Sequence, residues 1–84
     1  MSDSRLTVII RHHCPYCEMA LDLLDERNLV YKLLILNVDF TREEFTNLVP
    51  GAKTYPQILF DGKSIGGFEE LTSEIDNLVK FLNK

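Results

Sequence analysis

The sequence has only two cysteines among its 84 residues, and both lie in the stretch Cys14-Pro15-Tyr16-Cys17. Small secreted proteins that depend on a disulfide framework use more cysteines at wider spacing, so that class is excluded. The loop between these two cysteines is also too short for a useful restraint on the unfolded chain. We therefore expect the pair to carry chemistry rather than to stabilise the fold.

Long apolar runs and an excess of positive charge are also missing. No stretch approaches the roughly 20 apolar residues of a transmembrane helix, and residues 1–5 lack the charged head and apolar core of a signal peptide. Thirteen acidic against nine basic residues give a net charge of -4, which disfavours non-specific nucleic-acid binding. We expect one monomeric domain, residues 1–84, in the cytoplasm, with no membrane or nucleic-acid partner.

Hydrophobic patterning divides the chain into seven segments, with no repeat or linker between them. Short apolar or alternating runs predict strands at 7–11, 31–37, 57–60 and 63–65. Helical spacing of apolar residues predicts helices at 15–28, 41–49 and 68–82. The order βαβαββα predicts an α/β fold in which helices flank a small four-stranded mixed sheet, and its first crossover should be right-handed.

Local signals support these boundaries. Asn28 and the pair Pro50-Gly51 are suited to end the first two helices, and Thr41 is suited to cap the second. Asp61-Gly62 between two short strands is typical of a tight hairpin turn. The nearly continuous apolar run 33–36 is typical of a strand buried on both faces.

Two expectations concern side chains that face the core. In the helix 41–49 we expect Phe45, Leu48 and Val49 to face inward. In the helix 68–82 one apolar stripe follows helical spacing and should cover the sheet. That stripe consists of Phe68, Leu71, Ile75, Leu78, Val79 and Leu82.

The cysteine pair is placed at the junction between the first strand and the first helix. Pro15 suits the first turn of a helix, because its missing N–H would have no intrahelical acceptor there. Cys14 then lies at the helix N-terminus, where unpaired N–H groups and the helix dipole favour an anion such as a thiolate. Cys17, one turn later, is close enough to attack a mixed disulfide formed on Cys14.

Three motifs at their separations resemble the glutaredoxin family: Cys14-Pro15-Tyr16-Cys17, Thr54-Tyr55-Pro56 and Gly66-Gly67-Phe68. The resemblance covers nearly the whole chain. It implies a thioredoxin-like fold and glutathione-dependent reduction of protein disulfides and glutathione mixed disulfides. On this basis Cys14 is the nucleophile and Cys17 the resolving cysteine, although a merely buried Cys17 thiol remains open.

The same resemblance implies a glutathione site. Arg11 would hold a glutathione carboxylate and stabilise the Cys14 thiolate, and a cis Pro56 would present the Tyr55 backbone to an extended peptide. The first turn of the last helix would receive the γ-glutamyl end, unless its acids only complement the helix dipole. The implied contact residues are Arg11, Tyr16, Thr54, Tyr55, Pro56, Gly67, Phe68, Glu69 and Glu70.

Two other functions remain open at this stage. One is a thioredoxin-like electron donor that a flavin reductase, not glutathione, recharges, for example for ribonucleotide reductase as partner. The other is a metal or iron–sulfur module, to which His12 and His13 draw attention beside the cysteines. Zinc requires four tetrahedral ligands, and adjacent histidines seldom turn both rings onto one ion, so we expect no metal.

Overall fold

The computed structural model describes residues 5–82, and within this range it contains four strands and three helices in the predicted order. They are β1 (Leu6–Ile10), α1 (Pro15–Glu26), β2 (Tyr31–Ile35), α2 (Arg42–Leu48), β3 (Gln57–Phe60), β4 (Lys63–Gly66) and α3 (Phe68–Leu82). No helix in the described range is long and apolar enough to cross a membrane.

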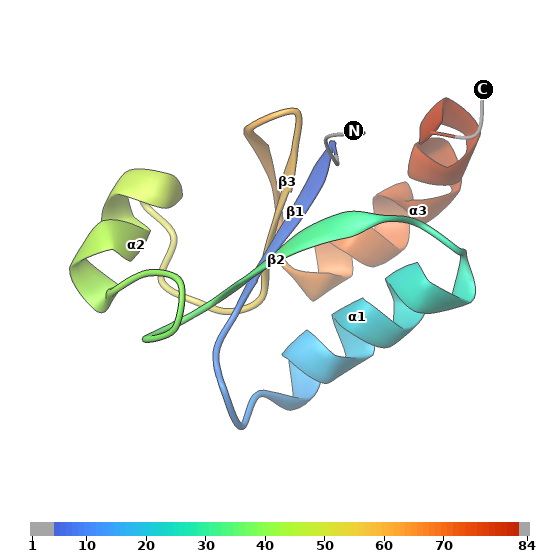
Figure 1. Ribbon diagram of the computed structural model, residues 1–84. Helices are drawn as coiled ribbons and strands as arrows, with labels where there is room; N and C mark the ends of the chain where they lie inside the picture. The colour runs from blue at the N-terminus through green and yellow to red at the C-terminus, as the bar shows by residue number, and fades with distance from the viewer. Residues whose placement is uncertain (1–4, 83–84) are drawn as a thin grey trace.

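The four strands form one mixed sheet in the order β2-β1-β3-β4. β1 is parallel to β2 and antiparallel to β3, and β3 is antiparallel to β4. The helices α1 and α3 lie on one side of the sheet and α2 lies on the other (Figure 1). The predicted mixed sheet with flanking helices is confirmed.

Each face of the sheet has its own apolar cluster. Under α1 and α3, the stripe residues Leu71, Ile75 and Leu78 pack against Leu6 and Ile58. Under α2, a smaller cluster consists of Ile9, Phe40, Phe45 and Val49. Because β1 contributes to both clusters, it is covered on both faces and fixes the loop that carries Cys14.

Capping and turn residues set the element boundaries as predicted. Thr41 and Glu44 form a reciprocal capping box at the start of α2, which satisfies two backbone N–H groups. Asn28 adopts a left-handed φ of 59° just after α1, and Asp61 and Gly62 have φ values of 52° and 82° in the hairpin turn. Asparagine, aspartate and glycine tolerate this region better than other residues.

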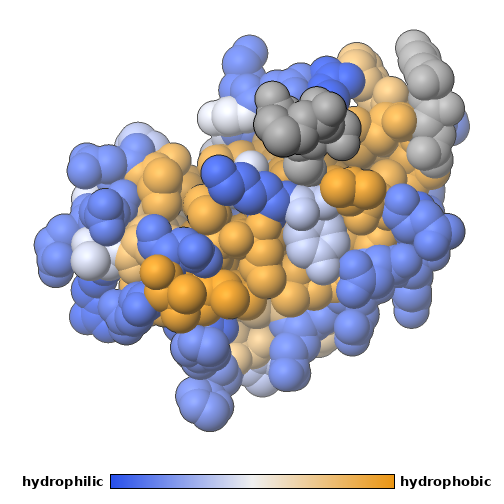
Figure 2. All heavy atoms as spheres, in the orientation of Figure 1, coloured by the Kyte–Doolittle hydropathy of each residue, from blue (hydrophilic) through white to orange (hydrophobic). Residues whose placement is uncertain are grey.

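Two burial predictions are wrong. β2 is an edge strand and is not covered on both sides, so Leu33 is 36% exposed and Val30, just before the strand, is 73% exposed. Hydrophobic surface accordingly extends over the middle of the face on which β2 lies (Figure 2). Leu48 is 38% exposed at the end of α2, whereas Phe45 and Val49 are buried as predicted.

Candidate active site

Cys14 is the N-cap residue of α1, as the sequence predicts. Its backbone is extended, with φ of -127° and ψ of 99°, and Pro15 occupies the first helical position. The Sγ atom of Cys14 accepts a hydrogen bond of 3.2 Å from the backbone N–H of Cys17. A negative charge on this sulfur would therefore be stabilised by a direct N–H donor and by the positive end of the helix dipole.

In this structure Cys14 and Cys17 are joined by a disulfide, with their Cα atoms 5.1 Å apart. Both residues are buried, and Cys17 at 2% exposure is more enclosed than Cys14 at 6%. Cys14 is thus slightly the more accessible of the two residues. The division between a nucleophile and a resolving cysteine stays a prediction.

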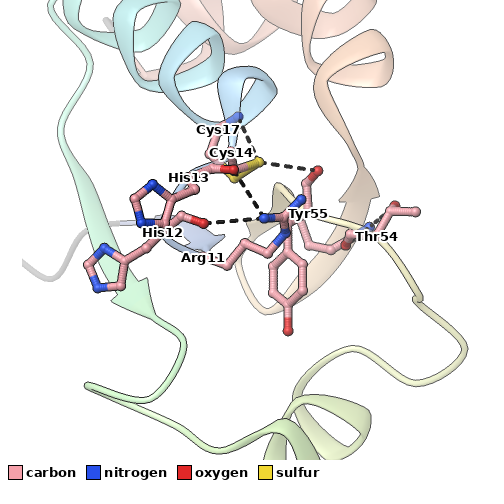
Figure 3. The surroundings of a disulfide bond; sticks show 8 residues. Arg11, His12, His13, Cys14, Cys17, Thr54 and Tyr55 are labelled. Carbon is pink, nitrogen blue, oxygen red and sulfur yellow. Dashed lines mark hydrogen bonds between the residues drawn. A yellow bond between two sulfur atoms is a disulfide. The ribbon is translucent and has the colours of Figure 1, made fainter.

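The loop before β3 lies directly against the redox pair. The Tyr55–Pro56 peptide bond is cis, which confirms the prediction. The carbonyl oxygen of Tyr55 lies 3.8 Å from the Sγ atom of Cys14 (Figure 3). A disulfide sulfur carries no hydrogen, so this is a contact in the oxidised protein and becomes a possible hydrogen bond only for the thiol. The Tyr55 backbone is therefore a neighbour of the sulfur that a bound chain could contact.

The Tyr55 side chain is held away from the redox pair by its own aromatic contact. The ring stacks on that of Phe45 in α2, with centroids 4.6 Å apart and planes inclined by 26°. The ring therefore extends the apolar cluster under α2 and does not fold over the sulfur. This anchoring leaves the Tyr55 backbone beside Cys14.

A groove of about 350 Å³ brings together eight of the nine predicted glutathione contacts. Its walls come from the first turn of α1, the loop before β3 and the first turn of α3. The Tyr16 and Phe68 rings, both part of its lining, contact each other with centroids 5.9 Å apart and planes inclined by 42°. The lining residues are Tyr16, Thr54, Tyr55, Pro56, Gly67, Phe68, Glu69 and Glu70.

Gly67 immediately precedes α3 and occupies the N-cap position of that helix. Its carbonyl accepts from the Leu71 N–H at 3.0 Å, and its own N–H donates to Oε1 of Glu70 at 2.8 Å. Glu70 is thus a capping residue, and at least one of its carboxylate oxygens is occupied in this structure. The N–H groups of Phe68 and Glu69 lie in the first turn, where no intrahelical acceptor exists.

Arg11 is not among the residues that line this groove. Its side chain extends toward Tyr55 beside the disulfide (Figure 3). Its Nη1 atom donates to the carbonyl oxygens of His12 and His13, at 3.2 and 3.1 Å. Arg11 lines a second cleft of about 590 Å³, which shares Thr54 and Tyr55 with the groove. The ninth predicted contact is therefore adjacent to the other eight but on a separate wall.

Comparison with known proteins identifies the family to which this fold and this cysteine pair belong. The family profile for glutaredoxin matches residues 6–65. The chain is 31% identical over 85 residues to Glutaredoxin-1 of Ectromelia virus (strain Moscow), which covers 93% of this chain and 77% of that protein. The chain belongs to the glutaredoxin family.

Solved structures of glutaredoxins have the same fold. The crystal structure of Glutaredoxin 1 from Francisella tularensis, complexed with cacodylate, matches with a TM-score of 0.73 and 32% identity over 94% of this chain and 96% of that one. The buckwheat glutaredoxin–glutathione complex matches in fold, with a TM-score of 0.73 at 22% identity, over 89% and 71% of the two chains. The fold is thioredoxin-like, and with its cysteine pair this glutaredoxin is a thiol–disulfide oxidoreductase.

The two histidines of this glutaredoxin are exposed, and His13 has a left-handed φ of 57°. Their rings lie on the side of the disulfide away from Tyr55 (Figure 3). Among residues 5–82 no group of three or more His, Cys, Asp or Glu side chains is placed to hold a metal ion.

Residues from α2 complete the surroundings of the site, and sequence reasoning missed them. Arg42, Phe45 and Thr46 line the second cleft together with Arg11. Phe45 was expected to face inward, but nothing in the local pattern connected α2 with the redox pair. The connection exists because the Tyr55 ring stacks on Phe45, a contact between segments ten residues apart whose geometry depends on the fold.

Proposed function

We propose that this glutaredoxin uses glutathione to reduce protein disulfides and protein–glutathione mixed disulfides. The observation that carries the proposal is the groove lined by Tyr55 and the start of α3, whose Tyr55 carbonyl lies 3.8 Å from the Cys14 sulfur. Glutathione is a short extended peptide with a thiol in the middle and charged groups at both ends. The groove and the adjoining cleft offer a partner of suitable chemistry to each part.

The γ-glutamyl end carries both a carboxylate and an ammonium. The first-turn N–H groups of Phe68 and Glu69 suit the carboxylate, and the side chain of Glu69 suits the ammonium. The Tyr55 backbone is placed to pair with the cysteinyl residue as an added strand. The glycyl end carries only a negative charge, which suits Arg11 beyond Tyr55. The buckwheat glutaredoxin, a protein of the same fold, is known as a glutathione complex.

Reduction of a mixed disulfide requires only Cys14. Its thiolate attacks the glutathione sulfur, the protein thiolate leaves and takes up a proton, and a Cys14–glutathione disulfide forms. A second glutathione thiolate attacks the bound glutathione sulfur, which releases glutathione disulfide and restores the Cys14 thiolate. The N–H of Cys17 donates to the Cys14 sulfur and would stabilise the thiolate in both steps.

Reduction of a protein disulfide uses both cysteines. The Cys14 thiolate attacks one substrate sulfur, and the Cys17 thiolate then attacks the Cys14 sulfur and expels the second substrate thiolate. The Cys14–Cys17 disulfide that results is the state of this structure. Two glutathione molecules return it to the dithiol and leave as glutathione disulfide. A reducing compartment such as the cytoplasm would supply that glutathione, and a disulfide in ribonucleotide reductase is one substrate to test.

The test couples glutathione, glutathione reductase and NADPH to a glutathionylated peptide and, separately, to a protein disulfide. Cys14→Ser should abolish both activities, whereas Cys17→Ser should retain the first and lose the second. Equal loss of the first activity in both variants would contradict the assigned roles. Turnover only with a thioredoxin reductase would favour the electron-donor alternative, and visible absorbance with bound iron would favour the iron–sulfur alternative.

A further inference from the structure

The cleft beside the groove concentrates positive charge in a chain whose net charge is -4. Arg11, Arg42 and Lys53 line it, and its described lining contains no Asp or Glu. Its other walls are apolar or neutral, from Leu36, Phe45, Thr46, Ala52, Thr54 and Tyr55. Three cations around one cleft of about 590 Å³ form a surface that attracts carboxylates.

None of these three cations is neutralised by a carboxylate in the described part of the chain. The ion pairs found there join Arg5 to Asp61 and Arg27 to Asp76. Arg11 donates only to backbone carbonyl oxygens. All three side chains belong to exposed residues and can therefore meet a partner.

The acids nearest along the chain are already engaged or lie outside the cleft. Glu43 and Glu44 follow Arg42 in α2, but neither lines the cleft. Oε1 of Glu44 accepts from the Thr41 N–H at 2.8 Å. The acidic residues of α2 therefore do not neutralise the positive charge of the cleft.

The position of the cleft relative to Cys14 makes it relevant to substrates. Thr54 and Tyr55 line both the cleft and the groove, and the Tyr55 carbonyl lies 3.8 Å from the Cys14 sulfur. An extended chain that pairs with the Tyr55 backbone therefore has one end over the cleft and the other over the groove, where Glu69 and Glu70 lie. The two ends of a substrate chain meet surfaces of opposite charge.

The N- to C-terminal direction of a bound substrate chain follows from the proposed function, and the inference rests on that function. The γ-glutamyl end of glutathione is assigned to the start of α3 and the glycyl end to Arg11. A protein substrate bound in the same direction places the residues that follow its reactive cysteine over Arg42 and Lys53. We propose that this cleft binds acidic side chains located C-terminal to the reactive cysteine of protein substrates.

Such contacts lie at a solvated rim, so they should mainly raise the rate of productive encounter and should weaken with salt. Each exposed pair contributes a factor of about two, so two carboxylates over two cations should give about a fourfold preference. The preference should depend on where the acids stand in the peptide as well as on their number.

The test uses the full chain with Cys17→Ser, so that the reaction stops at the first exchange. Peptides with one cysteine are supplied as mixed disulfides with thionitrobenzoate. The Cys14 thiolate attacks the peptide sulfur, a Cys14–peptide disulfide forms, and coloured thionitrobenzoate leaves with the electron pair of the broken S–S bond. Three peptides are compared, with two glutamates after the cysteine, two glutamates before it, or glutamines in both places.

We expect the peptide with glutamates after cysteine to react about four times faster than the glutamine peptide. Arg42→Gln combined with Lys53→Gln should remove this advantage and leave the glutamine peptide unchanged. The matched control, Lys32→Gln with Lys80→Gln, removes two exposed cations outside the cleft lining and should keep the advantage. The advantage should shrink in about 0.5 M salt, where the Debye length is roughly 4 Å.

Several results would overturn the proposal. Equal rates for the three peptides would show that the cleft does not recognise acids, and faster reaction of the peptide with glutamates before cysteine would reverse the direction. Equal slowing of all peptides by Arg42→Gln/Lys53→Gln would place the effect on the thiol or the fold. Binding of a labelled single-stranded oligonucleotide that the same double variant abolishes would assign the cleft to nucleic acid. Because the assay contains no glutathione, its outcome is separate from that of the glutathione-coupled assay.

Discussion

Replacing Glu70 by alanine should remove the side-chain cap at the start of α3. Oε1 of Glu70 accepts the Gly67 N–H at 2.8 Å, and Gly67 has no side chain with which to cap the helix itself. Loss of a cap costs about 1 kcal/mol, and loss of a carboxylate from the first helical turn costs about 0.5 kcal/mol more. We expect Glu70→Ala to lower the free energy of unfolding by about 1.5 kcal/mol, the sum of these two contributions.

Urea unfolding followed by circular dichroism measures this change. With a slope of about 1 kcal/mol per molar urea, the midpoint should fall by about 1.5 M at unchanged slope. Glu69→Ala is the matched control, because Glu69 lies in the same turn and its carboxylate makes no hydrogen bond within residues 5–82. That control should lose only the charge contribution, about 0.5 kcal/mol. Equal midpoints for the two alanine variants would refute the capping role.

Glu70→Gln separates the cap from ligand binding. Glutamine keeps an oxygen that can accept the Gly67 N–H, so most of the stability should remain. The negative charge is lost, so the KM for glutathione should rise about twofold if the second carboxylate oxygen meets the γ-glutamyl ammonium. An unchanged KM with the glutamine variant would leave Glu70 as a cap alone and Glu69 as the acid that meets glutathione.

Two further predictions concern the rest of the fold. Leu71→Ala, at a fully buried site of the core under α1 and α3, should lower the free energy of unfolding by about 2–5 kcal/mol in the same urea experiment, whereas Leu48→Ala at a 38% exposed site should cost under about 1 kcal/mol. The pKa of Asp61 is held below its usual value chiefly by the hydrogen bonds from Arg5, so its ion pair stabilises the folded state above about pH 4. That contribution is lost as the pH falls through the lowered pKa, so Asp61→Asn should be less stable than the parent at pH 7 and equal to it at strongly acidic pH, and a constant difference at all pH values would contradict the ion-pair explanation.

The fold could be predicted where the deciding signals are local. The bounds of α3 match the prediction because its apolar stripe repeats at helical spacing. The turn Asp61-Gly62 and the cap Thr41 act within four residues of themselves, so their effect depends little on the rest of the chain. Cys14 was placed correctly for the same reason, since Pro15 fixes the first helical position.

The errors occur where the outcome depends on strand order. The run 33–36 is apolar enough for an interior strand, but β2 pairs only with β1 and lies at the edge of the sheet. An apolar run indicates that the side chains of a strand favour burial. It does not indicate how many strands or helices cover that strand in the fold. The cleft was missed for a related reason, because Arg11, Arg42 and Lys53 come from three separate segments that the sheet and α2 bring together.

The two glycines before α3 differ in what the structure requires of them. Gly67 lines the groove, whereas Gly66 does not. Gly66 has a φ of 128°, and a Cβ atom built on it would lie 2.7 Å from Cγ of Glu70. The side chain of Glu70 fills the space that a Cβ would need. Gly66 is therefore required by the cap of α3, independently of any ligand.

Gly66→Ala should then lower the free energy of unfolding through two separable effects. The strained φ costs about 1–3 kcal/mol, and displacement of Glu70 costs about 1 kcal/mol more by breaking its bond to Gly67. In a Glu70→Ala background only the strain remains, so the double variant should be more stable than the sum of the single changes predicts, by about 1 kcal/mol. Urea midpoints of the four proteins give this coupling. Strict additivity would mean that the two residues act independently, and the close contact between them would then not explain the glycine.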